Sequence, residues 1–337
     1  MTVQRAGRPT MQDVAAVAGV SLKTVSRVVN KGPDVHPETA ARVQRAIDAM
    51  GFRRNELARS LVRGQKASTI GLVVGDLTNP FFAAIAKTVE RRAGDRDIAV
   101  FITSTDEDPA RERQLFEALV GRRVDGLLMV PTDGQQQYLL PELVRGTPVV
   151  FIDRFPNGVQ GDAATLDNFG GARLAVRHLL DHGHERIGVL ASPSFSVTQQ
   201  RLSGYRSALT MAGVRVDESL LVQLPDRSAA AAERGMNRLL DLPAPPTAVF
   251  TVTNFLTVGA LRALEARGAS TSIVGFDDLA YPDLLARPVT VVAHDPGDLG
   301  DAAADLLFSR LDGERGPARH VVLPTELIDR GSGALST

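Results

Sequence analysis

The chain has 337 residues, which is more than one ordinary domain, so two or three domains are expected. Its hydrophobic fraction of 44% is typical of a globular protein with a proper core, and no window approaches the about eighteen apolar residues that a membrane span needs. The polar, basic N-terminus has no apolar stretch behind it, so no signal peptide is indicated. The absence of cysteine excludes disulfides and thiolate metal sites. Because no signal peptide is indicated, we expect a cytoplasmic protein.

The net charge of -1 hides an asymmetry between the start of the chain and the rest. Residues 1–66 contain 12 Lys and Arg against 5 Asp and Glu, whereas the remainder contains 26 against 34. A basic head on an acidic body suits a polyanionic partner for the head alone. The alternative on charge alone is a solvated basic tail.

The first part of the chain has the pattern of two short helices joined by a tight turn. Thr10 can cap the first helix, and Asp13 three residues later completes a pair that resembles a capping box. Gly19 ends this helix, and Ser21 is a suitable cap for a second helix that runs to Asn30. The apolar face of the first helix is expected to contain Val14, Val17 and Ala18. Two short helices around a turn that contains glycine form a helix-turn-helix.

In a helix-turn-helix the second helix enters the major groove of DNA with its N-terminal residues at the base edges. Lysine and arginine are natural partners of guanine, and leucine can contact a thymine methyl group. The expected base-reading residues are Leu22, Lys23 and Arg27. Short polar side chains hold phosphates instead and set the register. The expected phosphate ligands are Thr10, Ser21, Thr24 and Asn30.

A third helix is expected to begin with Pro37 at its first position and to end at Gly51. Its Val43, Ile47 and Met50 have the spacing of a face that packs on the first two helices. Together the three helices predict an all-α head.

A short hinge helix is expected directly after the head, with Asn55 as its cap and Gly64 as its stop. Such a short helix is marginal alone in water, so we expect it to order against DNA and a second subunit. An apolar side chain inserted between base steps in the minor groove kinks a duplex, and Leu61 is the candidate wedge. The expected minor-groove residues are Asn55, Leu57, Ala58, Arg59, Ser60 and Leu61. The alternative is a plain linker helix.

The segments DVAAVAGVS, TVSRVVN, PETAARV and NELARSL match the head pattern of the lactose/galactose-repressor family of bacterial transcription regulators. The resemblance extends from about Thr10 to about Arg330. Two departures stand out. Arg54 replaces the usual proline, which can alter the entry to the hinge, and His36 replaces the usual serine or threonine cap of the third helix, which weakens that cap.

From about residue 69 the chain alternates short apolar runs with amphipathic stretches. The expected strands are 70–74, 99–104, 126–130, 149–153, 187–190, 248–252 and 273–276. The expected helices are 82–93, 110–120, 170–181, 200–212, 230–240, 258–267 and 297–311. This alternation predicts an α/β architecture of parallel sheets with helices on both faces.

The body resembles the two-lobed periplasmic-binding-protein fold that the family uses as a sensor. The resemblance implies three crossings between the lobes, which we place near Thr165, His294 and Pro324. The expected domains are a head (1–53), a hinge helix and linker (54–66) and an effector-binding and dimerisation domain (67–337). Within the last, the first lobe takes about 67–165 and 295–323, and the second takes about 166–294 and 324–337.

Parallel sheets bind ligands at the C-terminal ends of their strands, and polar or aromatic residues cluster at those positions here. The family's turn NPFF and its effector-clamping arginine are matched by residues 79–82 and by Arg201. Carboxylates, amides and an arginine fork are suitable partners for sugar hydroxyls. The expected effector-binding residues are Asp76, Phe81, Phe82, Asp153, Phe195, Arg201, Arg227, Asn254 and Asp277.

Arg227 bears on the chemistry of the effector, because it stands where many relatives place a stacking aromatic residue. It could pair with a carboxylate or phosphate, which favours an anionic effector. The alternative is that Arg227 is simply exposed and that Phe195 or Phe255 forms the apolar platform. The sequence leaves both readings open.

No catalytic, cofactor or metal site is expected. His178 and His182 lie one helical turn apart, which is metal-like spacing, but no acidic ligand is fixed beside them. Residues 106–108 indicate an acidic loop and helix cap rather than a catalytic pair. The sequence contains none of the common nucleophile, nucleotide or zinc motifs.

These observations predict a transcription regulator, expected to be a repressor. It should bind a pseudo-palindromic operator as a homodimer, with a sugar-like effector between the lobes that biases the hinge helix. The residues after Arg330 show no leucine heptads, which favours a dimer over a tetramer. A solute-binding protein and a sugar-processing enzyme are the alternative classes.

Overall fold

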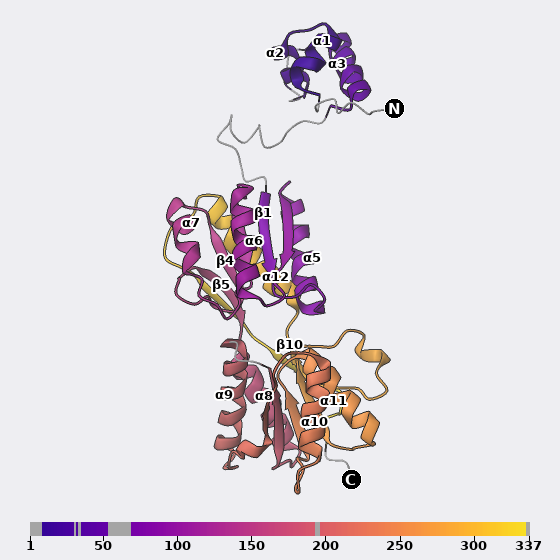
Figure 1. Cartoon of the computed structure of the whole chain (residues 1–337), viewed down its shortest axis with the longest axis vertical. Coiled ribbons are helices and arrows are strands. Elements are labelled where there is room, and N and C mark those ends of the chain that lie inside the picture. The colour runs from indigo at the N-terminus through magenta and orange to yellow at the C-terminus, as the bar shows by residue number, and fades with distance from the viewer. Residues whose placement is uncertain (1–8, 30–31, 33–34, 53–68, 193–195, 335–337) are drawn as a thin grey trace. The chain divides into compact units, whose positions relative to one another are not determined.

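The computed structural model describes residues 9–29, 32, 35–52, 69–192 and 196–334. The chain divides into two compact units, Met1–Gln65 and Lys66–Thr337, which are called the head and the sensor below (Figure 1). Along the described residues, no helix is long and apolar enough to cross a membrane.

The head contains three helices, α1 (Met11–Ala18), α2 (Leu22–Val29) and α3 (Pro37–Met50). The expected capping box is confirmed, because the Thr10 hydroxyl accepts from the amide of Asp13 and the Asp13 carboxylate accepts from the amide of Thr10. Gly19 and Gly51 end α1 and α3 in the left-handed conformation that glycine adopts most easily. His36 makes no side-chain cap for α3, as its replacement of serine or threonine predicts.

A small apolar core holds the three helices of the head together. Val14, Val25 and Val43 are fully buried, one from each helix, and Ile47 and Met50 pack against them. The expectation that Val17 belongs to this face is wrong, since its side chain is 62% exposed. At about 100° per residue, Val17 lies about 200° from the buried Ala15 and so points outward.

Two six-stranded sheets form the two lobes of the sensor, and they share one strand order. The first sheet has the order β11-β5-β4-β3-β1-β2, and the second has β12-β10-β9-β8-β6-β7. The strands of the first sheet are β1 (Thr69–Val74), β2 (Ala99–Ser104), β3 (Gly126–Met129), β4 (Val149–Asp153), β5 (Asp162–Leu166) and β11 (His320–Leu323). Those of the second are β6 (Ile187–Ala191), β7 (Leu221–Gln223), β8 (Ala248–Thr251), β9 (Ser272–Phe276), β10 (Thr290–Ala293) and β12 (Glu326–Ile328).

The expected parallel α/β architecture is confirmed, with one exception at an edge. Each strand pairs with its neighbours in parallel except β12, which runs antiparallel to β10. Five strands, β5, β7, β10, β11 and β12, were not expected from the sequence. They have three to five residues each, and β7, β11 and β12 lie at sheet edges, where alternating or partial burial leaves no continuous apolar run.

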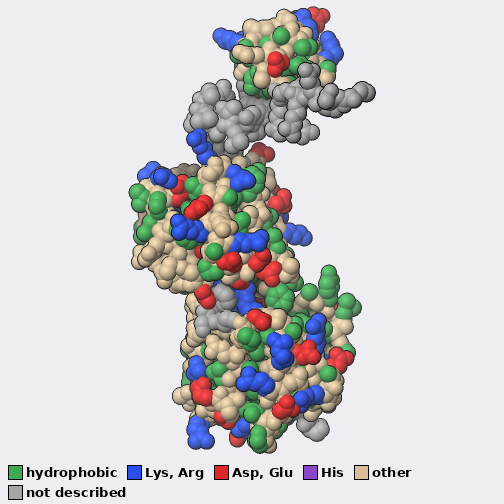
Figure 2. All heavy atoms as spheres, viewed as in Figure 1, with side chains coloured by type: hydrophobic (Ala, Val, Ile, Leu, Met, Phe, Trp, Pro, Cys, Tyr) green, Lys and Arg blue, Asp and Glu red, His purple; other side chains and the backbone are tan. Residues whose placement is uncertain are grey.

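Helices cover both faces of each sheet. The helices of the sensor are α5 (Pro80–Gly94), α6 (Pro109–Gly121), α7 (Leu140–Arg145), α8 (Asn168–Asp181), α9 (Ser196–Met211), α10 (Ala229–Leu240), α11 (Asn254–Arg267) and α12 (Pro296–Leu311), with 3₁₀ turns η1 (Gln137–Leu139), η2 (Glu218–Leu220) and η3 (Pro282–Leu284). In the first lobe α5 and α12 pack together on one face, and α6 covers the other. In the second lobe α8 pairs with α9, and α10 pairs with α11. Figure 2 shows positive and negative side chains intermingled over the visible face of the sensor.

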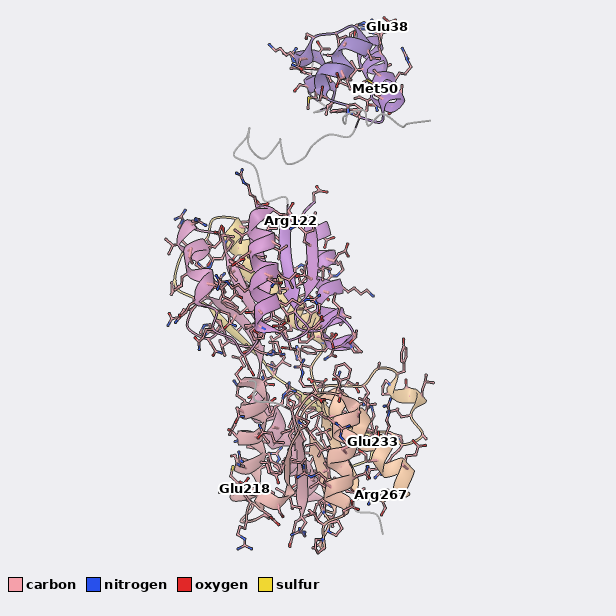
Figure 3. All side chains as sticks on the ribbon, in the orientation of Figure 1. Glu38, Met50, Arg122, Glu218, Glu233 and Arg267 are labelled. Atoms are coloured by element: carbon pink, nitrogen blue, oxygen red, sulfur yellow. The ribbon has the colours of Figure 1, made fainter. Side chains whose placement is uncertain are left out.

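The chain passes between the sheets three times, after β5, after β10 and after β11. Helix α12 follows the second of these passages and belongs to the first lobe, where its Leu299, Leu307 and Phe308 join the core under the sheet. Figure 3 shows Arg122, just after α6, at the end of the first lobe away from the second, and Glu218 and Arg267 at the far end of the second lobe. The loops that follow the C-terminal ends of the strands therefore face each other where the lobes meet.

Candidate functional site

Helix α2 of the head has one buried side and one exposed side. Val25 is buried in the small core, while Leu22, Lys23 and Arg27 are exposed. Leu22, at the first position of α2, leaves 46% of its surface exposed although it is apolar. Leu22 and Lys23 also line a hollow of about 560 Å³ together with Thr10, Met11, Gln12 and Ser26.

The polar residues expected at phosphates lie at the starts of α1 and α2. The Ser21 hydroxyl accepts from the amide of Thr24 at 3.1 Å and lies 2.9 Å from the Thr24 hydroxyl. Thr10 is held by its capping box. Some of the expected site residues lie outside the described part of the chain: Asn30, the hinge residues Asn55, Leu57, Ala58, Arg59, Ser60 and Leu61, and Phe195.

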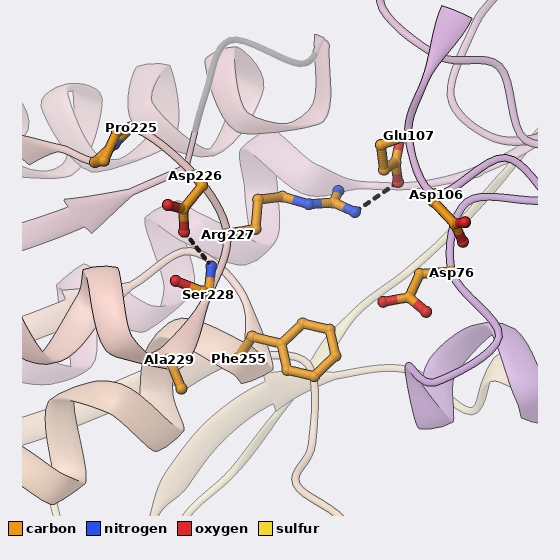
Figure 4. A pocket seen from close by; sticks show the side chains of 9 residues that line it. All are labelled: Asp76, Asp106, Glu107, Pro225, Asp226, Arg227, Ser228, Ala229 and Phe255. Carbon is orange, nitrogen blue, oxygen red and sulfur yellow. Dashed lines mark hydrogen bonds and ion pairs between the residues drawn. The ribbon is translucent and has the colours of Figure 1, made fainter. Parts of the chain in front are cut away.

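In the sensor, a cavity of about 760 Å³ lies where the two lobes meet (Figure 4). The first lobe contributes three acidic residues and the second contributes a loop and an aromatic ring. The lining residues are Asp76, Asp106, Glu107, Pro225, Asp226, Arg227, Ser228, Ala229 and Phe255. Of the expected effector residues, Asp76 and Arg227 line this cavity, and Phe255, the alternative aromatic platform, lines it too.

Glu107 of the first lobe binds two arginines, one from each lobe. Its carboxylate accepts two hydrogen bonds from Arg154 of its own lobe, at 2.7 and 2.8 Å, and one from Arg227 of the second lobe at 2.6 Å. Burial acts to raise the pKa of Glu107, but the hydrogen bonds and charges of the two arginines outweigh it and hold the pKa below its usual value. The carboxylate is therefore ionised at neutral pH.

Asp153 and Arg154 stand at the end of β4, behind Glu107. Asp153 has a left-handed backbone (φ 68°), which aspartate tolerates better than most residues. Arg154 is almost fully buried and, besides Glu107, donates to the Asp153 carboxylate at 3.1 Å and to the carbonyl of Pro131 at 3.2 Å. Neither Glu107 nor Arg154 was among the expected effector-binding residues, although each follows the end of a strand and so satisfies the rule that selected Asp153.

Arg201 and Asp277 form a matching buried pair in the second lobe. Arg201 donates to Asp277 at 3.2 Å, to the carbonyl of Val252 at 2.6 Å and to Asn168 at 2.8 Å, and its guanidinium lies 3.6 Å from the ring centre of Phe276. Burial raises the pKa of Asp277 above its ordinary value although Arg201 opposes this, and the charge of Asp153 acts in the same direction as burial. The negative charge of Asp153 in the first lobe therefore acts on Asp277 in the second lobe.

A second direct contact between the lobes joins two asparagines. The Asn79 side-chain oxygen caps α5 by accepting from the amide of Phe81, and it also accepts from the Asn254 amide at 3.0 Å. Phe82 is buried in the core of the first lobe, packed edge-on to Phe81. Asp76 uses its carboxylate to hold the amide and hydroxyl of Thr78. The NPFF turn thus contributes to lobe contact and to packing.

The described part of the chain contains no group of three or more residues suited to hold a metal ion. The acidic loop 106–108 is a helix cap as expected, because Asp108 accepts from the amide of Ala110, but its Glu107 also belongs to the boundary between the lobes.

Comparison with known proteins places both units. Residues 10–55 match the family model described as bacterial regulatory proteins, lacI family, and residues 176–333 match the periplasmic binding protein-like domain. The regulator CelR of Thermobifida fusca is 34% identical over 98% of this chain and 100% of its own length. The ribose operon repressor of Escherichia coli K12 is 32% identical over 96% of this chain and 99% of its own. The chain belongs to the lacI family of bacterial regulatory proteins.

Solved structures of the lacI family agree. The complex of CelR with cellobiose has a TM-score of 0.71 at 33% identity, covering 96% of this chain and all of that one. The lac repressor dimer bound to operator and the anti-inducer ONPF has a TM-score of 0.84 at 26% identity, covering 97% and 100%. The chain is therefore a DNA-binding transcription regulator, and this excludes the two alternative classes, a solute-binding protein and a sugar-processing enzyme.

Proposed function

We propose that this protein represses transcription by binding a pseudo-palindromic operator as a homodimer in the cytoplasm, and that a sugar-like effector in the cavity between the lobes controls its affinity for DNA. The observation that carries the DNA half is the division of α2 into a buried side with Val25 and an exposed side with Leu22, Lys23 and Arg27. In this motif such a side reads base edges.

Dimerisation follows from the size of the recognition surface. One eight-residue helix reads too few base pairs to select a site in a genome, whereas two copies on a two-fold axis double the half-site. The lac repressor structure bound to operator is a dimer. The hinge residues 55–61 are proposed to order in the minor groove, with Leu61 from each subunit as a wedge.

The effector half of the proposal rests on the cavity of about 760 Å³. Its polar groups come from both lobes, and Phe255 offers an apolar surface for the face of a sugar ring. Asp153, Arg201, Asn254 and Asp277 are not among the residues that line this cavity, but they lie at the same boundary between the lobes, and we propose that they also contact the ligand. CelR has been solved with cellobiose, and another relative is named for the ribose operon. A ligand that favours one arrangement of the lobes shifts operator affinity by its differential binding.

The first experiment is selection of bound duplexes from a random pool at near-physiological salt, followed by a screen of neutral sugars on the selected site. A palindrome with a central pyrimidine–purine step is expected, because such steps kink most easily. Failure to enrich any sequence, with ligand binding intact, would contradict the proposal for the head.

Arg27→Ala tests base reading. The variant should lose about 1–3 kcal/mol of operator affinity and relax the preference at one position of each half-site. Arg42→Ala removes an exposed arginine from α3 and is the matched control for general charge. If Arg27→Ala lowers the affinity for all DNA sequences equally, Arg27 contacts phosphate only.

Asp277→Asn tests the effector site while preserving side-chain shape and tolerance of the left-handed backbone (φ 66°). The variant should lose the effector response and keep operator affinity. Asp283→Asn, which changes an exposed residue of the 3₁₀ turn η3 in the same lobe, is the control. Unchanged effector affinity in Asp277→Asn would remove Asp277 from the site.

A further inference from the structure

Two loops in equivalent positions of the two lobes meet across the cavity. In the first lobe the loop after the edge strand β2 presents Glu107 directly before Asp108, the cap of α6. In the second lobe the loop after the edge strand β7 presents Arg227 directly before Ser228, the cap of α10. Figure 4 shows the Arg227 side chain extended across the cavity toward Glu107. The pair is mostly shielded, since 20% of the Arg227 side chain and 13% of that of Glu107 are exposed.

We infer that Glu107 determines effector specificity by occupying the anion position of the cavity, so that the site takes neutral polyhydroxylated ligands and rejects their acidic counterparts. This inference rests on the proposed effector site and adds the chemical class of ligand that it admits. It decides between the two readings of Arg227 that the sequence leaves open.

The geometry of Glu107 is that of a bound carboxylate ligand. One oxygen accepts from Arg154 at 2.8 Å and from Arg227 at 2.6 Å, and the other accepts from Arg154 at 2.7 Å. Arginine forks bind carboxylates in this two-bond manner, and such charge-assisted bonds are the strong ones. A carboxylate or phosphate on an entering ligand would find both cations already bound to Glu107.

The backbone of this loop supports a fixed position for Glu107. Asp106 and Glu107 both have left-handed backbone angles, φ 53° and 61°, and the Thr105 hydroxyl accepts from the amide of Glu107 at 3.1 Å. Residues other than glycine adopt this conformation uncommonly, and aspartate and asparagine adopt it more readily than glutamate does. The carboxylate is therefore presented by the fold.

The remaining charges in the cavity also disfavour an acid. Asp76, Asp106 and Asp226 line it, against Arg227 as the one lysine or arginine in the lining described here. Displacement of Glu107 by a ligand anion would leave a shielded carboxylate near these three acids and near Asp153. A partly buried charge that loses its partners carries a large desolvation cost. Neutral hydroxyl groups can instead donate to these carboxylates, and Phe255 can contact the ring face.

Glu107→Gln tests the inference because it removes the charge and keeps the side-chain length. Affinities of the full chain are measured by calorimetry for matched pairs that differ in one carboxyl group, such as glucose with glucuronate and cellobiose with cellobiouronate, at constant ionic strength. The wild-type protein should favour the neutral member of a pair. The variant should shift this preference toward the acid by about ten- to a hundredfold, the value of one charge-assisted hydrogen bond.

Asp97→Asn is the matched control. Asp97 is an exposed acid of the same lobe with the same left-handed backbone (φ 59°), and it lies outside the cavity lining. The Asp97→Asn substitution removes one negative charge, and it should leave the preference for neutral over acidic ligands unchanged. If it shifts the preference as much as Glu107→Gln does, net charge rather than the position of Glu107 is responsible.

The outcomes separate this inference from the proposed function. A wild-type protein that favours the acid, or a Glu107→Gln variant with unchanged preference, overturns the inference and leaves a sugar site in place. If the wild-type protein binds neither the neutral nor the acidic sugars, the proposed effector site is overturned, and the inference with it. Neutral preference in the wild type with a shift only in Glu107→Gln supports both.

Discussion

The two lobes of the sensor have one topology and opposite charges at matching positions. When the strands of each lobe are counted in chain order, both sheets have the same arrangement. The second strand lies at one edge, followed by the first, third, fourth and fifth strands, and the last strand lies at the other edge. The residue before the cap of the helix that follows the edge strand is Glu107 in the first lobe and Arg227 in the second. The shared topology places these residues opposite each other, and the sequence alone makes them attract.

The same correspondence holds one layer deeper. An aspartate with a left-handed backbone stands at the end of the fourth strand of each lobe, Asp153 as the last residue of β4 and Asp277 directly after β9, and each is paired with a buried arginine. The arginines come from different places, since Arg154 is the next residue in the chain whereas Arg201 comes from α9. The shared topology therefore determines the position of the aspartate, whereas the arginine that pairs with it comes from a different element in each lobe.

Away from this boundary the lobes differ. At the start of β5 in the first lobe, Asp162 binds Arg310 through two hydrogen bonds and also accepts from Arg319. In the second lobe Thr290 stands at the corresponding start of β10, where its amide donates to the Ser332 hydroxyl and its hydroxyl donates to Asp329. At the same end of that sheet, the His184 ring lies between the Thr247 hydroxyl and the Gly333 carbonyl. Four substitutions or conditions test this comparison, from the largest expected effect to the smallest.

Arg154→Met should lower the free energy of unfolding by about 3–5 kcal/mol, because it leaves Glu107 and Asp153 shielded without their main cation. Urea denaturation measures the loss. Arg201→Met is the matched variant of the second lobe, and the correspondence between lobes predicts a similar loss. A loss below about 1 kcal/mol for Arg154→Met would mean that the carboxylates are solvated.

Asp162→Asn should cost about 1–3 kcal/mol, since a neutral amide makes weaker bonds to Arg310 and Arg319. Burial acts to raise the pKa of Asp162, but the two arginines outweigh it and lower the pKa. The stabilisation from this lowered pKa is therefore present above the ordinary aspartate value and is lost as the pH falls below it. Urea midpoints at neutral and acidic pH should converge for wild type and variant, and a constant gap would contradict this.

Asn254→Ala removes the amide contact with Asn79 and should cost about 0.5–1.5 kcal/mol. Because the contact joins the lobes, hydrogen exchange should increase near β8 and the start of α5 and stay unchanged in the outer ends of both sheets. Asn237→Ala, on α10 of the same lobe, is a control away from the boundary. Uniformly faster exchange would show a general loss of stability instead.

Mild acid should weaken the second lobe before the first. Burial lowers the pKa of His178 and of His184 below the usual histidine value, so the unfolded chain takes up these protons first and stability falls as the pH drops through about 6.5. The slope is at most about 1.4 kcal/mol per pH unit for each proton. Hydrogen exchange at pH 7 and pH 5.5 should show earlier loss of protection in β6 and β9 than in β3 and β4. The reverse order would contradict it.

Sequence patterns predicted the long helices and strands and the class of the site. They did not predict the features that depend on contacts between residues far apart in the sequence. Continuous apolar runs gave the central strands, and caps such as Thr10 and Asp13 gave the boundaries of the head. Short strands such as β5 and β12 exist because neighbours in the sheet supply their hydrogen bonds, which no local pattern encodes. Arg227 was selected because it replaces an aromatic residue, but its partner Glu107 lies 120 residues away in the sequence and could not be paired with it beforehand.

The three passages of the chain between the lobes also set the order in which the protein can be made. The head is contiguous, so its three helices can pack as soon as the first fifty or so residues leave the ribosome. The first lobe, by contrast, still lacks α12 and β11 when the whole of β1 to β10 has been synthesised. The core surface that Leu299, Leu307 and Phe308 later cover stays open until then. During translation a folded head therefore precedes an unfinished sensor, which makes the nascent sensor a natural client for chaperones.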